Sequence, residues 1–136
     1  METIRYFIIG EDTVRSAQLK FSSLFPYLSI SFFDTDNHCV ADKSNAYCME
    51  VKLKSINKRL RVGVIEIDST MTVADFENQM KEKFGLSVQL SRLSGNSWIQ
   101  TSLTDHLTLD VQNKLGEELR QRNGTFSTYK DVPFGC

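Results

Sequence analysis

The chain repeats its own pattern at a spacing of 59 residues, and this repeat restricts the fold more than any other feature. Thr13 precedes a helical pattern that ends at Phe25, and Thr72 precedes a second pattern that ends at Phe84. The same spacing places apolar residues on apolar residues through a whole strand and helix. We therefore predict an internal duplication in which two similar units build one compact domain.

Each unit has the pattern of a strand, a helix and two further strands, written βαββ. In the first unit we expect a strand over 3–9, a helix over 14–25, a half-buried strand over 28–32 and a short strand over 38–41. In the second unit we expect strands over 60–67, 86–90 and 98–101, a helix over 73–84 and a further helix over 107–119. On the second helix, Glu77 and Lys81 have the spacing of an exposed ion pair.

These elements predict an α+β fold in which two tandem βαββ units form one sheet with helices packed on one face. The first unit covers residues 1–59, the second unit with its C-terminal helix covers 60–122, and an aromatic tail covers 123–136. The stretch 46–57 fits a strand and a helix about equally, and a duplicated chain favours the helix. A strand there would instead give the second unit the order ββαββ, which is the order of a ubiquitin-like β-grasp.

Charge and hydropathy exclude several classes of protein. The chain of 136 residues carries 16 basic and 17 acidic side chains, so no overall field directs it to nucleic acid or to an anionic membrane. No apolar run approaches the roughly 20 residues that span a bilayer. Three cysteines, without a signal-peptide pattern, lead us to expect reduced thiols and a cytoplasmic location.

One segment carries a family resemblance. The run from Phe84 to Leu90, followed by Ser94-Gly95-Asn96 and Trp98, resembles a family of small uncharacterised bacterial proteins. The resemblance implies a bacterial or phage setting and no site residues. The helix, the turn from Arg92 to Asn96 and the order of the strands are also similar to those of ubiquitin-like proteins.

Catalytic and metal-binding patterns are weak. Asp34 and Asp36 follow a predicted strand as an aspartate nucleophile would, but Asp and Asn also favour the turn predicted there. His38, Cys39 and Cys48 are residue types that bind zinc, yet their spacing matches no structural zinc motif. We interpret these residues as a turn and as free cysteines, and we expect no enzyme activity, no metal and no cofactor.

A basic cluster is the candidate nucleic-acid patch. It lies within ten residues that contain no carboxylate, and it consists of Lys52, Lys54, Lys58, Arg59 and Arg61. Base stacking needs aromatic side chains between the cations, and this segment has none. A solvated sheet edge is therefore the preferred interpretation.

The tail is the candidate partner-docking segment, through Phe126, Tyr129 and Phe134. These aromatic residues either pack back on the sheet or are offered to a partner. We expect a non-enzymatic protein-interaction module whose partner is another protein and whose binding survives salt. The alternative is a small nucleic-acid-associated protein that uses residues 52–61, whose binding falls steeply with salt. The sequence leaves the oligomeric state open.

Overall fold

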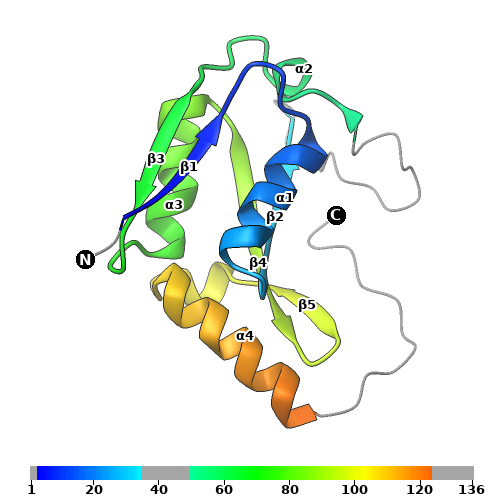
Figure 1. The fold of residues 1–136 in the computed structure, drawn as a ribbon, viewed down its shortest axis with the longest axis vertical. Helices are drawn as coiled ribbons and strands as arrows, with labels where there is room; N and C mark the ends of the chain where they lie inside the picture. The colour runs from blue at the N-terminus through cyan, green and yellow to red at the C-terminus, as the bar shows by residue number, and fades with distance from the viewer. Residues whose placement is uncertain (1–2, 35–49, 124–136) are drawn as a thin grey trace.

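The computed structural model describes residues 3–34 and 50–123, and these residues form the predicted α+β fold (Figure 1). The strands are β1 (Ile4–Ile8), β2 (Leu28–Phe33), β3 (Gly63–Ile67), β4 (Ser87–Ser94) and β5 (Ser97–Gln100). The helices are α1 (Val14–Leu24), the single turn α2 (Leu53–Ile56), α3 (Val73–Gln79) and α4 (Leu109–Asn123). A π-helical turn (Met80–Phe84) continues α3, and a 3-10 turn (Ser102–Thr104) precedes α4.

The strands form two antiparallel sheets instead of the single sheet that we expected. One sheet is the ribbon of β1 and β3, and the other has the order β2-β4-β5. Tyr6 of β1 lies opposite Ile65 of β3, and Ser31 of β2 lies opposite Gln89 of β4. Each described strand of the first half, β1 and β2, therefore pairs with its counterpart in the second half. This cross-pairing produces two sheets because the helix in each half carries the chain from one sheet to the other.

Both main helices begin with the same cap. The Thr13 hydroxyl accepts the N–H of Ser16 over 3.1 Å, and the Thr72 hydroxyl accepts the N–H of Asp75 over 3.0 Å. In each case the third helical residue bonds back to the N–H of the cap, which completes a capping box. The two threonines that define the repeat in the sequence therefore begin the two helices, as predicted.

The segments that begin α2 and α4 make matching contacts with these caps. The first residue of α1 donates its N–H to Val51 over 2.9 Å, and the first residue of α3 donates to Leu107 over 3.0 Å. In return, Leu53 of α2 and Leu109 of α4 donate to the segments before α1 and α3, over 2.9 and 3.0 Å. The single turn α2 thus has the place in the first half that the long helix α4 has in the second. The duplication itself stays a prediction.

The stretch for which helix and strand were both open contains α2. Between residues 50 and 62 there is no strand, and a single isolated β-bridge joins Lys52 to Thr13. The described residues therefore do not form the ββαββ order of a β-grasp. Residues 46–49 and the short strand expected over 38–41 lie outside the described part of the chain.

Aromatic rings from both halves meet in one core. Tyr6 and Phe21 contact each other edge to face with ring centres 5.9 Å apart, and Phe76 lies 5.7 Å from Tyr6 and 5.2 Å from Phe21. All three side chains are fully buried. The Tyr6 hydroxyl donates to the carbonyl of Ala17 over 2.9 Å, so its polar end is satisfied.

Strand β2 is buried on both faces, so the half-buried pattern that we expected is wrong. Its apolar residues lie in the core, and Ser29 and Ser31 on the other face are also buried. Ser91, which lies opposite Ser29 on β4, is fully buried as well. Serine alternates with apolar residues in β2 because one buried face carries small side chains. The serines do not mark a face that is exposed to solvent.

A close approach holds α4 against the start of β2. A Cβ atom on Gly116 would lie 2.7 Å from the Cβ of Tyr27, closer than real Cβ contacts. One turn earlier, the fully buried Gln112 accepts a hydrogen bond from Arg92 over 2.9 Å and donates to the carbonyl of Thr104 over 2.7 Å. Gly116 therefore allows α4 to pack closely against the residue that precedes β2.

The predicted ion pair between Glu77 and Lys81 is not formed. The Glu77 carboxylate instead turns inward and accepts the N–H of Leu90 over 3.0 Å, where β4 extends beyond its partner β5. Burial raises the pKa of Glu77, and the nearby charge of Asp105 adds to this effect against the Leu90 hydrogen bond. The carboxylate thus satisfies a backbone donor of the sheet.

Candidate functional site

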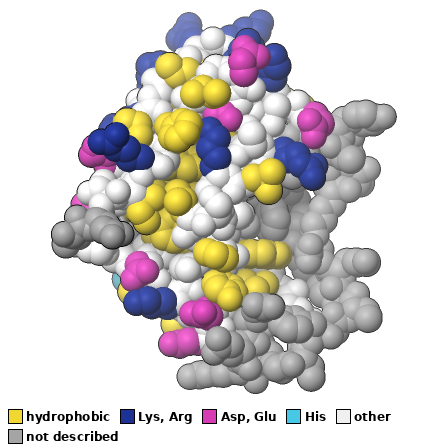
Figure 2. All heavy atoms as spheres, in the orientation of Figure 1, with side chains coloured by type: hydrophobic (Ala, Val, Ile, Leu, Met, Phe, Trp, Pro, Cys, Tyr) yellow, Lys and Arg dark blue, Asp and Glu magenta, His cyan; other side chains and the backbone are white. Residues whose placement is uncertain are grey.

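The outer face of the β1–β3 ribbon is apolar and exposed. Phe7 and Val64 lie directly opposite each other on this face and are 48% and 38% exposed. Ile9 and Val62 continue the same alternation beyond the strand ends and are 52% and 61% exposed. We call these four residues the ribbon face. Figure 1 shows α3 behind the ribbon, and Figure 2 shows hydrophobic side chains gathered on the side that faces the viewer.

Lysine side chains occupy backbone acceptors at both edges of the ribbon. The Lys20 ammonium donates to the carbonyl of Phe7 over 3.0 Å, and the Lys83 ammonium donates to the carbonyl of Val64 over 3.3 Å. A further strand would need such carbonyls as hydrogen-bond acceptors. The ribbon is therefore protected at its edges while its outer face stays open.

A buried carboxylate fixes Lys20 in this position. Asp12 accepts hydrogen bonds from the N–H of Ile9 over 2.8 Å, from the Ser16 hydroxyl over 2.7 Å and from Lys20 over 2.7 Å. Burial by itself would raise the pKa of Asp12, but these donors outweigh it and the pKa is lowered. The Lys20 ammonium also lies 4.4 Å from the centre of the Phe7 ring, a cation–π contact.

Three further cations surround the ribbon face. Arg5 lies on the same face of β1 as Phe7 and is opposite Glu66 of β3. The Arg61 guanidinium donates to the carbonyl of Lys83 over 3.1 Å and also to the carbonyl of Glu82. Within the described part of the chain, Arg5, Arg61 and Lys83 form no ion pair. We call Arg5, Lys20, Arg61 and Lys83 the basic rim.

The cations of the basic cluster that was predicted over 52–61 have different surroundings in the structure. Lys52 and Lys54 both bind the carboxylate of Glu11, over 2.6 and 3.1 Å, and their hydrogen bonds and charges lower the pKa of Glu11. Lys58 and Arg59 lie on an exposed loop that lines a cavity of about 520 Å³ formed by residues 55–59. Arg61 turns to the end of the π-helical turn, as described above. Three of the five cations therefore already have partners within the chain, and Lys58 and Arg59 lie on the exposed loop.

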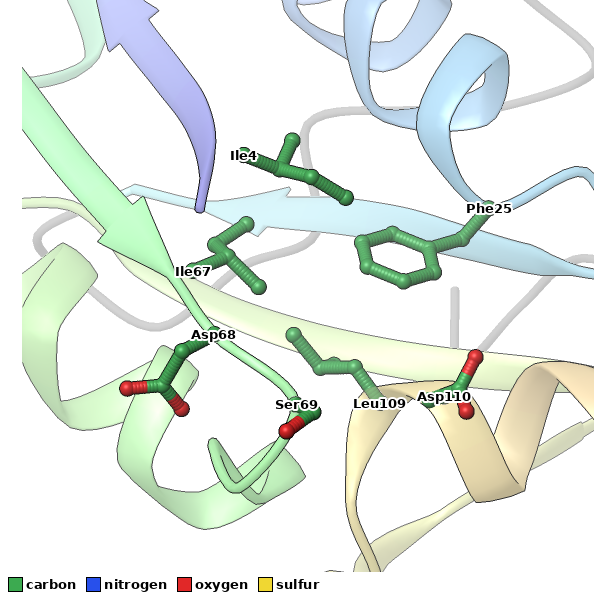
Figure 3. Close-up of a pocket in the computed structure, with 7 residues that line it drawn as sticks. All are labelled: Ile4, Phe25, Ile67, Asp68, Ser69, Leu109 and Asp110. Carbon is green, nitrogen blue, oxygen red and sulfur yellow. The ribbon is translucent and has the colours of Figure 1, made fainter. Parts of the chain in front are cut away.

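A small pocket opens at the other end of the ribbon (Figure 3). It has a volume of about 260 Å³, and four apolar side chains point into it. These are Ile4, Phe25, Ile67 and Leu109. The carboxylates at its margin already have partners, because Asp68 accepts from Thr70 over 2.7 Å and Asp110 pairs with Lys114 over 3.3 Å. The pocket therefore suits an apolar side chain better than a charged ligand.

The other predicted candidates contribute no site within the described residues. Asp34 is described and half-buried, whereas Asp36, His38, Cys39 and Cys48 lie outside the described part. The aromatic tail residues Phe126, Tyr129 and Phe134 also lie outside it. Residues 3–34 and 50–123 contain no group of three or more His, Cys, Asp or Glu side chains that could hold a metal ion.

The ribbon face was missed in the sequence, although a signal was present. Residues 6–9 are apolar without interruption, and the alternation through Val62 and Val64 shifts to Ile65 and Ile67. In a two-stranded ribbon such patterns place apolar side chains on both faces, and one helix layer covers one face alone. A run of this kind therefore indicates an exposed apolar face when few strands are available.

Two further searches concern membrane-spanning helices and similarity to known proteins. Within the described residues, no helix is long and apolar enough to cross a bilayer. A comparison of the chain with family models, curated protein sequences and solved structures found no match.

Proposed function

We propose that this chain is a non-enzymatic protein-interaction module of the bacterial or phage cytoplasm, and that another protein docks on the ribbon face. The exposed pair of Phe7 and Val64 is the observation that carries this proposal. Apolar side chains that adjoin one another on a surface mark a protein contact more often than isolated ones do. Ile9 and Val62 extend the pair into one continuous surface.

The mode of binding follows from the edges of the ribbon. Lys20 and Lys83 occupy carbonyls that a strand added to β1 or β3 would need. A partner therefore docks its side chains on the face and does not extend the sheet. Burial of such apolar side chains stabilises a complex by roughly 25 cal/mol for each Å² removed from water, before the costs of association.

The test is affinity capture of the tagged chain from its host, with and without nuclease. Val64→Glu places a charge at the centre of the ribbon face, and Leu103→Glu is the matched control because Leu103 is 92% exposed on a different element. We expect a stoichiometric protein that survives nuclease and moderate salt, is retained by Leu103→Glu and is lost with Val64→Glu. Unchanged capture by Val64→Glu contradicts the proposal.

Nucleic acid is the alternative partner, through Lys58 and Arg59 on their exposed loop. Capture would then be dominated by nucleic acid, disappear on digestion, and fall steeply with salt. Because Glu11 already binds Lys52 and Lys54, the structure supports this alternative less well than the protein partner.

A further inference from the structure

Resting on the proposed function, we infer that the partner docks through an acidic amphipathic segment. Its apolar side chains cover the ribbon face, and carboxylates on either side of them meet the basic rim. This inference names the chemistry of the partner, which the exposed apolar surface alone does not determine.

The charges around the ribbon face carry the argument. Arg5, Arg61 and Lys83 form no ion pair within the described residues, and a single carboxylate, Glu66, lies on the same face of the ribbon. Lys20 presents its ammonium over the Phe7 ring, and its counter-charge Asp12 is buried behind it. A docked partner therefore meets an apolar centre with an excess of positive charge at its border.

Three of the four rim cations are already held in place. Lys20, Arg61 and Lys83 each donate to a backbone carbonyl of the strand or helix beside them. Side chains that are fixed before binding lose less conformational freedom when they meet a partner's carboxylate. A preorganised rim therefore favours binding of a partner's carboxylates more than mobile surface lysines would.

The same charges disfavour a second copy of this chain as the occupant. Two ribbon faces brought together around a two-fold axis would bring two basic rims together. Like charges in a contact that excludes water weaken association. Nucleic acid is also disfavoured on this face, because its phosphates would meet the four apolar side chains at the centre of the rim.

The experiment selects 16-residue peptides from a random display library with the wild-type chain and removes those that also bind Val64→Glu. We expect the remaining peptides to combine apolar residues with flanking Asp or Glu. For the tightest peptide, measured by fluorescence anisotropy, we expect Lys83→Gln to weaken binding about three-fold, as surface ion pairs usually do. Lys114→Gln removes an exposed cation of α4 that does not belong to the basic rim, so it serves as the control and should leave the affinity unchanged.

Charge reversal completes the test. Lys83→Glu should weaken the acidic peptide further and should bind a peptide in which one Glu is replaced by Lys. Peptides that depend on Val64 but are neutral or basic overturn this inference and leave the proposed function in place. A Val64-dependent dimer in ultracentrifugation also overturns it, and the absence of any Val64-dependent peptide counts against the proposed function itself. Circular dichroism melts confirm that each variant is folded.

Discussion

Replacing Gly116 by alanine should destabilise the fold, although the same change in a helix normally stabilises it. In an exposed helix interior, alanine is favoured over glycine by about 1 kcal/mol. Here the new Cβ would lie 2.7 Å from the Cβ of Tyr27, 3.1 Å from its carbonyl oxygen and 3.3 Å from the Cγ of Arg92. Carbon atoms in good contact lie roughly 3.5–4.0 Å apart, so α4 must move by about 1 Å away from the start of β2.

The expected magnitude follows from these two opposing effects. Overpacking of a buried contact costs about 1–3 kcal/mol, which exceeds the gain in helix propensity for most of that range. We therefore expect the free energy of unfolding to fall by roughly 1 kcal/mol, with a decrease of about 4 °C in Tm for a chain of this size. The loss comes from the contact between α4 and the β2-β4-β5 sheet.

The measurement is urea unfolding followed by circular dichroism, with Gly10→Ala as the matched control. A Cβ on Gly10 meets no atom within 4 Å, so that change should be neutral or stabilise the protein by roughly 0.4–1 kcal/mol. If Gly116→Ala stabilises the chain as much as Gly10→Ala does, the close packing of α4 on Tyr27 is wrong.

Two further predictions concern buried polar groups. Asp12→Ala should lower the free energy of unfolding by roughly 2–3 kcal/mol, because the N–H of Ile9 and the Lys20 ammonium lose their acceptor. Because the pKa of Asp12 is lowered in the folded chain, its contribution to the free energy of unfolding is present above about pH 4 and is lost as the pH falls through the folded-state pKa. Asp12→Asn should therefore weaken the loss of stability at acid pH. An unchanged loss of stability at acid pH argues against this role of Asp12. Tyr6→Phe should cost about 1 kcal/mol at neutral pH through the lost hydrogen bond to Ala17. Burial, with the charge of Asp12 adding to it, raises the pKa of Tyr6, so the unfolded chain releases this proton first and stability falls above pH 10 by about 1.4 kcal/mol per pH unit. Unfolding midpoints measured from pH 8 to 11 should show a shallower decline for Tyr6→Phe, and equal slopes contradict this role.

Local features of the fold could be predicted from the sequence. The caps Thr13 and Thr72, the helix end at Gly85 and the turn at Gly95 depend on residues within a few positions of each other. Gly85 and Gly95 both have positive φ, which explains the choice of glycine. The apolar stripes of both main helices also agree with the side chains that are buried.

Contacts between distant parts of the sequence could not be predicted in the same way. Glu11 reaches Lys52 and Lys54 from 41 and 43 residues away, and this contact alters the charge of the predicted basic cluster. Glu77 has the spacing of a surface ion pair with Lys81, but a free backbone donor on β4 attracts its carboxylate. In both cases the charged side chain binds a partner that is distant in the sequence and close in the folded structure.

The cross-pairing of strands makes the connection between the halves part of the stability of the protein. Among the described residues, β1 and β2 have strand partners in the second half alone, so neither half completes its own sheets. As separate molecules the halves would have to associate, and their stability would depend on protein concentration. A short covalent connection instead holds such partners at an effective concentration on the order of millimolar. We therefore expect the two halves to stay associated at dilutions that would separate two free subunits.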